Sequence, residues 1–370
     1  MRTIHRIPDK KKICSLLLVV ILLLGLTGCG GDAGSSYDPL SGVETTTLRD
    51  DADREVELPA EITRVAPSGA VAQMVLMSIA PEALVGLSSS PSTLQMPYFP
   101  EEMWYLPTFG QFYGGKATLN QESLLAAEPQ LIIDIGDKKT SIAADMDGIQ
   151  KQTGIPVIYL SGDLEQLPAT YRTLGRLLGK EEKGEQLASY IEKTLDMAEE
   201  NRAKIPEEER MRVYFGTGTS GLACNASGSS QADVIDIVGA VNAVQVPESE
   251  VTNKGGGTNV NLEQIYKLDP DVFLFDPGGP YDTAEDSEWS ELTGIKAGRY
   301  YEIPNLPYSW MASPPSVNRV LGVWWLGNLL YPEIYDYDMI EVAREYYALF
   351  WDYDLTDREA RELLANSTLK

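Results

Sequence analysis

The sequence is nearly devoid of histidine: the one copy, His5, lies close to the N-terminus, in a stretch that we assign below to a leader peptide. The rest of the chain has no imidazole to serve as a general base or a metal ligand. This excludes Ser–His–Asp and Cys–His catalysis and the histidine-based zinc, manganese and copper sites. The lack of histidine counts against an enzyme, and we expect a protein that is not one, with no catalytic residues, no metal ligands and no cofactor.

Cysteine is also scarce, with copies only at Cys14, Cys29 and Cys224. Cys14 would be removed with the leader, and Cys29 is the expected site of a lipid. Cys224 would then be the one free thiol, so no intramolecular disulfide can form. We expect Cys224 to be a buried structural thiol rather than a reactive one.

Positive charge is in short supply. The chain has 30 Lys and Arg against 55 Asp and Glu, a formal net charge of −25. So acidic a protein repels a phosphate backbone, and no basic stripe occurs in the sequence, so we expect no binding to nucleic acid.

A length of 370 residues, with 43% hydrophobic residues, is sufficient for two folded domains.

The N-terminus has the pattern of an export signal. A basic stretch at 2–12 precedes an apolar run at 13–26, which is too short to favour a permanent membrane span. The segment Leu26-Thr27-Gly28-Cys29 resembles the bacterial lipobox, which implies cleavage before Cys29 and a lipid on its thiol; an ordinary signal with a chance cysteine is the alternative. We expect a lipid-anchored protein on the outer side of a bacterial cell membrane.

A segment at 114–133 is repeated, in weaker form, at 255–274. Five positions are identical: two glycines, an asparagine, a glutamate and a proline. Each copy predicts a loop, a helix capped by Asn120 or Asn261, a proline turn and a buried strand. A glutamate two residues after each cap, Glu122 or Glu263, meets the positive end of the helix dipole. A repeat at this distance indicates two similar lobes and a cleft between them.

The remaining pattern predicts an α/β fold. Apolar strand-like runs alternate with helical patterns in both halves of the chain, which indicates largely parallel sheets. Between the halves, apolar residues at helical spacing among charged ones predict one long bridging helix. The expected parts are a leader at 1–28, the lipidated cysteine and a flexible tether at 29–44, an N-terminal lobe at 45–182, a linking helix at 183–205 and a C-terminal lobe at 206–370.

Loops that follow strands supply the candidate ligand-binding residues, because open α/β sheets bind ligands at strand ends. Tyr113, Tyr308 and Trp310 are aromatic residues in such loops, although packing in the core is an alternative for each. Ser68 ends a short strand, and Thr217 lies in a small-residue loop whose backbone could approach a ligand closely. Lys116 and Lys254, beside the repeated glycines, are the nearest basic candidates.

Taken in order, these segments resemble the iron-siderophore and cobalamin class of ABC-transporter substrate-binding proteins. The resemblance covers about 45–364. It includes Asn120-Gln-Glu122, Glu128-Pro129, Asn261-Leu-Glu263, Asp269-Pro270 and the Pro314-Pro315-Ser316-Val-Asn-Arg319 segment. It implies two lobes bridged by one long helix, a monomer, and Glu122 and Glu263 as the carboxylates that dock onto arginines of a membrane permease and its ATPase.

The resemblance also implies a ligand, which we expect to be an iron complex such as a ferric siderophore. Relatives with this segment often have an arginine where the chain has Ser313. Its absence, with the many aromatics, favours a bulky chelate over a small anion. The alternatives are a corrinoid, haem, a molybdate-like oxyanion or bare Fe³⁺ in the same role. A carboxylate-based extracellular hydrolase and a surface adhesin are more remote.

Overall fold

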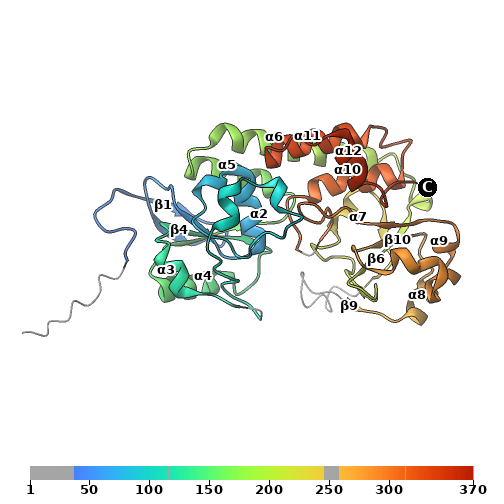
Figure 1. Cartoon of the computed structure of the whole chain (residues 1–370), viewed down its shortest axis with the longest axis horizontal. Helices are drawn as coiled ribbons and strands as arrows, with labels where there is room; N and C mark the ends of the chain where they lie inside the picture. The colour runs from blue at the N-terminus through green and yellow to red at the C-terminus, as the bar shows by residue number, and fades with distance from the viewer. Residues whose placement is uncertain (1–36, 116, 246–257, 313, 370) are drawn as a thin grey trace, which may run out of the picture. The chain divides into compact units, whose positions relative to one another are not determined.

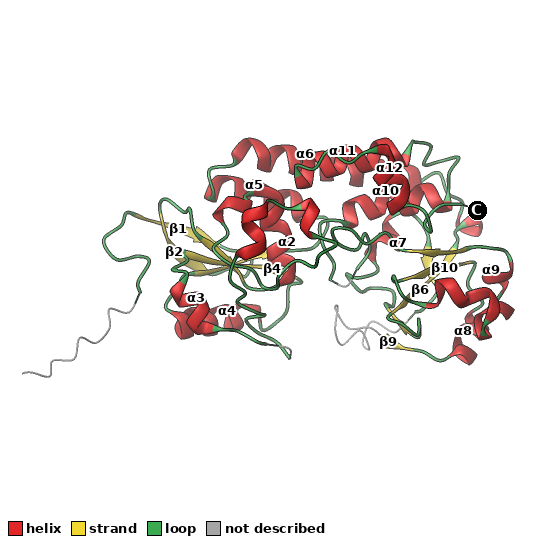
Figure 2. Ribbon diagram, in the orientation of Figure 1, coloured by secondary structure: helices red, strands yellow, loops and turns green. Residues whose placement is uncertain are grey.

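The structure is a computed structural model that describes residues 37–115, 117–245, 258–312 and 314–369. The chain divides into two units, Met1–Asp38 and Pro39–Lys370, and every element below belongs to the second. Figure 1 labels these elements, and Figure 2 distinguishes helices from strands.

The N-terminal lobe, from β1 to α5, is built on a parallel sheet of order β3–β4–β5. Every residue of the three strands except Gly136 is buried, as expected for a parallel sheet covered on both faces. In Figure 1, α5 lies above this sheet, with α3 and α4 below it. An antiparallel hairpin, β1–β2, precedes it. The bounds are β1 Thr45–Arg49, β2 Glu55–Pro59, β3 Val65–Pro67, α2 Ala70–Ile79, α3 Gln121–Ala126, β4 Leu131–Gly136, α4 Ile142–Thr153, β5 Val157–Ser161 and α5 Leu167–Leu177.

The C-terminal lobe, from β6 to α12, has a mixed sheet of order β11–β10–β6–β7–β9, with β8 also paired to β6. Its centre is parallel, and β7 and β9 add an antiparallel edge. This edge was not expected from the sequence, because two-residue strands have no recognisable periodicity. The bounds are β6 Arg212–Thr217, β7 Ala223–Cys224, α7 Asp233–Ile237, β8 Val241–Asn242, β9 Thr258–Asn259, α8 Leu262–Leu268, β10 Val272–Phe275, α9 Thr293–Lys296, β11 Tyr300–Glu302, α10 Arg319–Leu330, α11 Met339–Trp351 and α12 Asp357–Leu363. The two-lobed α/β architecture with parallel sheets is confirmed.

The long helix predicted between the lobes is α6, Glu181–Arg202. It packs against α5 of the N-terminal lobe and against α7 and α10 of the C-terminal lobe. A second connection was not predicted: α11, near the C-terminus, packs back against α2 in the N-terminal lobe. The ammonium of Lys183 on α6 donates to the carbonyl of Leu349 on α11 at 2.6 Å. The long helix α6 therefore bridges the lobes, and α11 adds a packing contact between them.

Within the described residues, the capped helix, the proline turn and the strand of the repeated segment occur in both lobes. Asn120 accepts a hydrogen bond from the Ser123 amide at 3.0 Å at the start of α3. Asn261 accepts one from the Gln264 amide at 2.9 Å at the start of α8. Glu128 and Asp269, at equivalent positions just before a proline, both have positive φ, 47° and 41°. A proline disfavours the helical region for the residue before it, so each helix ends there and the strand begins.

Candidate functional site

Two of the predicted ligand-binding residues meet on a third that the sequence analysis did not select. The hydroxyl of Ser68, at the end of β3, donates to Oδ1 of Asp134. The hydroxyl of Tyr113 donates to Oδ2 of the same carboxylate at 2.8 Å. Ser68 has no exposed surface, and Asp134 is 3% exposed. Asp134 was signalled by the sequence, since it is a charged residue inside the apolar run of β4.

Backbone hydrogen bonds place Tyr113 at this point. The Phe109 amide donates to the carbonyl of Leu87 at 2.7 Å, and the Phe112 amide donates to the carbonyl of Ser68 at 2.9 Å. The rings of Phe109 and Phe112 are buried, which fixes the loop against the sheet. Tyr113 is half-buried beside it. The segment at 109–113 is therefore a structured wall of the lobe.

The electrostatics around Asp134 are those of a buried acid with hydroxyl partners. Burial raises the pKa of Asp134, while the hydrogen bonds from Ser68 and Tyr113 and the charge of Lys139 act to lower it. The Lys139 ammonium lies 5.6 Å from the centre of the Tyr113 ring, within range of a cation–π contact. Burial, followed by the negative charge of Asp134, raises the pKa of Tyr113 well above its ordinary value.

In the C-terminal lobe, Thr217 ends β6 and is half-buried. Its hydroxyl donates to the carbonyl of Ala223 at 3.1 Å, across the β6–β7 pair. The amide of Gly218 donates to the carboxylate of Asp276 at 3.2 Å, and burial raises the pKa of this acid. This loop therefore also has a carboxylate at a strand end, since Asp276 directly follows β10.

Tyr308 lies where the lobes meet, whereas Trp310 lies in the core. The Tyr308 hydroxyl donates to the sulfur of Met77 on α2 at 3.4 Å. Its ring packs against Phe99 and Trp351 at centroid distances of 5.8 Å and 5.7 Å. Trp310 has no exposed surface and packs edge-on to Trp325. The structure thus places Trp310 in the core, the alternative that the sequence left open.

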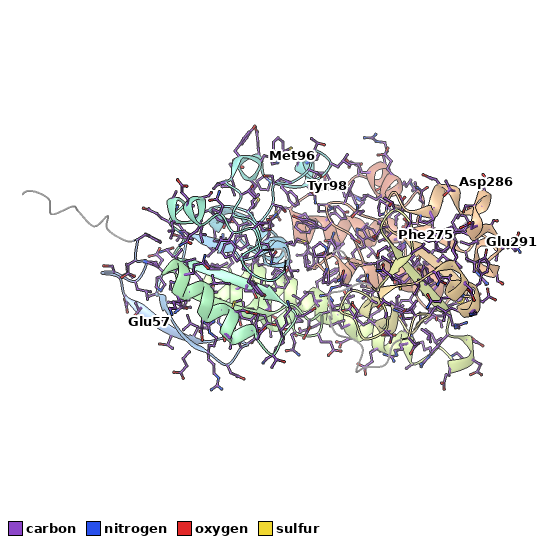
Figure 3. The ribbon with its side chains drawn as sticks, turned by 90° about the horizontal axis from the view of Figure 1, so that it is seen from below. Glu57, Met96, Tyr98, Phe275, Asp286 and Glu291 are labelled. Carbon is purple, nitrogen blue, oxygen red and sulfur yellow. The ribbon has the colours of Figure 1, made fainter. Side chains whose placement is uncertain are left out.

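Part of the segment at 91–106, around Gln95, Tyr98 and Phe99, packs between the lobes. Tyr98, which Figure 3 labels, lies on the short 3₁₀ turn Met96–Tyr98. The centre of its ring lies 5.6 Å from that of Tyr347 and 4.8 Å from that of Tyr353. The Gln95 side chain donates to the carbonyl of Pro307 at 2.7 Å. One hydrophobic cluster extends from the N-terminal lobe through these rings to α10 and α11. These rings stabilise the junction between the lobes.

Polar contacts join the lobes nearer the sheets. The Ser230 hydroxyl donates to the carboxylate of Asp137, just after β4, at 2.9 Å. Arg319 on α10 donates to the carbonyl of Gly162, just after β5, at 2.7 Å, and it forms an ion pair with Asp233. Arg319 is 1% exposed. The sequence signal for its role was an arginine at the start of an otherwise apolar helix.

Glu122 and Glu263 lie in the first turns of α3 and α8, one in each lobe, and both are exposed. Glu263 forms an ion pair with Lys267 at 2.8 Å, with both side chains more than 70% exposed. An exposed pair of this kind is worth about 0 to 1 kcal/mol, so both carboxylates are available to a partner.

Several predicted residues lie outside the described part of the chain: Cys29, Lys116, Lys254 and Ser313. Within the described residues, no group of three or more His, Cys, Asp or Glu side chains could hold a metal ion. Within the same ranges, no helix is long and apolar enough to cross a membrane. Cys224 is free and buried, as expected, and its thiol donates to the carbonyl of Thr258 at 3.1 Å.

Comparison with known proteins identifies the fold. The sequence profile described as "Periplasmic binding protein" matches residues 65–306. An ABC transporter substrate-binding lipoprotein of Bacillus subtilis, YvrC, is 22% identical over 331 residues, which is 87% of this chain and 96% of the relative.

Solved structures agree with this match. An ABC transporter solute-binding protein from Sulfurospirillum deleyianum is 27% identical and has a TM-score of 0.78, covering 86% of this chain and 99% of that one. The molybdate-binding protein MolA of Haemophilus influenzae, solved with molybdate, is 18% identical and has a TM-score of 0.68. The match covers 84% of this chain and 99% of MolA.

Proposed function

The chain belongs to the periplasmic binding protein family, the substrate-binding components of ABC transporters, and we propose that its ligand is an iron complex such as a ferric siderophore. The complex would bind between the lobes and be delivered to a membrane permease and its ATPase. The observation that carries the proposed delivery to a permease is the repeated capped helix with an exposed glutamate, Glu122 in one lobe and Glu263 in the other. Two exposed carboxylates, one in each lobe, suit docking onto a partner that has a cationic group opposite each lobe.

The choice of an iron complex is supported by the chemistry near Ser68 and Tyr113. The buried ionisable group there is the carboxyl of Asp134, which gives a small anion no positive charge to bind. Related folds differ in ligand: one structure from Staphylococcus aureus is a haem complex, and one from Vibrio cholerae is a catecholate-siderophore binding protein. Haem and a corrinoid are therefore the nearest alternatives, and a molybdate-like oxyanion is the least compatible with Asp134.

The ligand is tested by titrating the full chain with ferric desferrioxamine, haemin, cobalamin and molybdate and following tryptophan fluorescence. The expected result is saturable quenching by an iron complex. Tight binding of molybdate alone would contradict the proposed ligand class, because it would require cationic groups at the site.

Docking is tested by reversing both glutamates, Glu122→Lys and Glu263→Lys, in one variant. Uptake of radiolabelled ligand by cells should be lost, while ligand affinity in solution should be unchanged. The matched control is Glu199→Lys with Glu341→Lys, two exposed glutamates on α6 and α11, which lie on the upper side of the second unit in Figure 1, away from α3 and α8. If both double variants lose uptake equally, net charge and not docking is responsible.

We also propose that Cys29 carries a lipid that holds the protein at the membrane, in keeping with the lipoprotein name of the Bacillus relative. Cys29→Ser should move the protein from the membrane fraction to the soluble fraction of cells. Retention of the variant in the membrane fraction would show that another segment provides the anchor.

A further inference from the structure

We propose that Asp134 is a specificity-determining residue of the ligand site: it holds the Tyr113 hydroxyl as a hydrogen-bond donor, so that Tyr113 offers its ring to the ligand and not a phenolate. The site then accepts a metal that an organic chelator or macrocycle already encloses, and it rejects a free ferric ion. This inference rests on the proposed function in one respect, namely that Tyr113 touches the ligand.

The first step is geometric. The carboxylate of Asp134 uses one oxygen for Ser68 and the other for Tyr113, at 2.8 Å in the second case. The donors come from two segments, the end of β3 and the loop before α3, while Asp134 lies within β4. The Asp134 carboxylate is held on both oxygens and therefore has little freedom. Because the Tyr113 hydroxyl is bonded to this carboxylate, the fold sets the direction of the Tyr113 ring.

The second step is electrostatic. A tyrosine binds Fe³⁺ as a phenolate, so its proton must leave before the metal can bind. A phenolate at Tyr113 would lie against the buried carboxylate of Asp134, and both burial and like charge oppose this. Lys139 lies over the Tyr113 ring and not in an ion pair with the hydroxyl. Tyr113 therefore remains a phenol.

The third step concerns the other candidates for binding a bare ion. The Tyr308 hydroxyl is directed to the sulfur of Met77, its ring lies between Phe99 and Trp351, and burial raises its pKa well above the ordinary value. In the described part of the chain, no cluster of Asp, Glu, Cys or His offers a replacement. Among the described residues, Tyr113, Tyr308 and the acidic side chains therefore offer no set of ligands to a bare ferric ion.

The first experiment adds Fe³⁺, supplied as the nitrilotriacetate complex, to the full chain and records the visible spectrum. No tyrosinate-to-iron charge-transfer band is expected. A band that appears in the native protein and disappears in Tyr113→Phe would overturn the proposal. This outcome does not depend on the chelate that the protein transports, so the proposal is tested even if no organic ligand is found.

The second experiment compares variants at the two positions, using whichever of haemin, cobalamin and ferric desferrioxamine binds the native chain. Tyr113→Ala, which removes the ring, should weaken binding about 10- to 100-fold. Tyr113→Phe keeps the ring and removes the hydroxyl that anchors it, and Asp134→Asn keeps the ring and weakens the acceptor of that hydroxyl, so each should cost less than about 10-fold. The double variant should be no weaker than the worse single one, because both changes break the same contact.

Two results of this comparison would contradict the proposal. If Tyr113→Phe weakens binding as much as Tyr113→Ala, the hydroxyl itself contacts the ligand. If the losses from Tyr113→Phe and Asp134→Asn add, Asp134 acts through something other than Tyr113. Ser68→Ala, which removes only the second donor to Asp134, serves as the milder variant if Asp134→Asn fails to fold. It should weaken binding less than Tyr113→Ala, and an equal loss counts against the role of the ring.

Discussion

The guanidinium of Arg319 donates a hydrogen bond of 2.7 Å to the backbone carbonyl of Gly162, 157 positions earlier in the chain. The same side chain donates to the carbonyls of Ser230 and Ser316 and forms an ion pair with Asp233. Gly162 follows β5 in the N-terminal lobe, and the other partners belong to the C-terminal lobe. One buried arginine therefore ties the lobes together beside the strand ends.

Arg319→Gln should strongly destabilise the protein, because it leaves the half-buried carboxylate of Asp233 and several carbonyls without their donor. Removal of one partner from a buried pair costs about 3 to 5 kcal/mol. Arg319→Lys keeps the charge but cannot match the planar arrangement of donors on a guanidinium. Its free energy of unfolding should therefore lie between those of the native chain and Arg319→Gln. Urea denaturation measures the free energy of unfolding. The exposed pair Arg358–Glu362 provides the control, since Arg358→Gln should cost less than about 1 kcal/mol. Equal losses at both sites would show that Arg319 is not a special contact.

Asp233 should make stability depend on pH. Burial raises its pKa from 3.8 to about 6, against the opposing charge of Arg319 and with a contribution from Asp137. Between pH 4 and 6 the folded chain then holds a proton that the unfolded chain has released. The contribution of Asp233 to the free energy of unfolding must therefore fall as the pH rises through this window. Comparison of the native chain with Asp233→Asn at several pH values isolates this contribution. A difference that rises with pH would show that the attraction of Arg319 outweighs burial.

Trp310→Phe should reduce stability without weakening ligand binding, because the indole is fully buried and packs against Trp325. The smaller ring leaves a cavity, and the expected cost is about 1 to 3 kcal/mol. Trp104, half-buried with its ring nitrogen bonded to the carbonyl of Met96, is the matched control, and Trp104→Phe should cost less. A large loss of ligand affinity in Trp310→Phe, at unchanged stability, would instead indicate that Trp310 contacts the ligand.

The two N-caps should contribute similarly to stability in the two lobes. Asn120→Ala and Asn261→Ala each remove a side-chain acceptor from a helix start, at a cost of about 1 kcal/mol. Thermal unfolding of each variant measures this. Asn305, exposed in a loop, is the control, and Asn305→Ala should leave the midpoint unchanged.

Cys224 should resist alkylation in the folded protein. Burial raises the pKa of its thiol to about 11, so very little thiolate exists at neutral pH. Iodoacetamide should modify it only after denaturation, as measured by mass spectrometry. Rapid modification of the folded chain would show that this region opens readily.

Much of the architecture could be predicted from local patterns. The cap at Asn120, the proline turn at Pro129 and the apolar run of β4 lie within 20 residues of one another, and each is a short-range signal. The same signals in the second copy predicted the second lobe. The charged amphipathic pattern predicted α6 to within a few residues at each end. The antiparallel edge strands β7 and β9 were missed, because two residues are too few to show alternation.

The proposed ligand site was harder to predict, because it depends on residues that are distant in sequence. Ser68, Tyr113 and Asp134 lie in three separate segments, and nothing local indicates that two hydroxyls share one carboxylate. Tyr308 and Trp310 looked alike as aromatics in one loop. The structure directs one to Met77 between the lobes and buries the other in the core.

The amino-acid sequence alone determined the exclusion of histidine chemistry, the acidic surface, the repeated capped helix and the expectation of two lobes, because each depends on composition or on neighbours a few residues apart. Only the tertiary structure decided that Asp134 holds Ser68 and Tyr113, that the rings near Tyr98 join the lobes, and that Arg319 reaches Gly162. These contacts require strands and helices to pack before their side chains can meet, and hydrogen bonds between buried groups depend on distances that no sequence pattern contains.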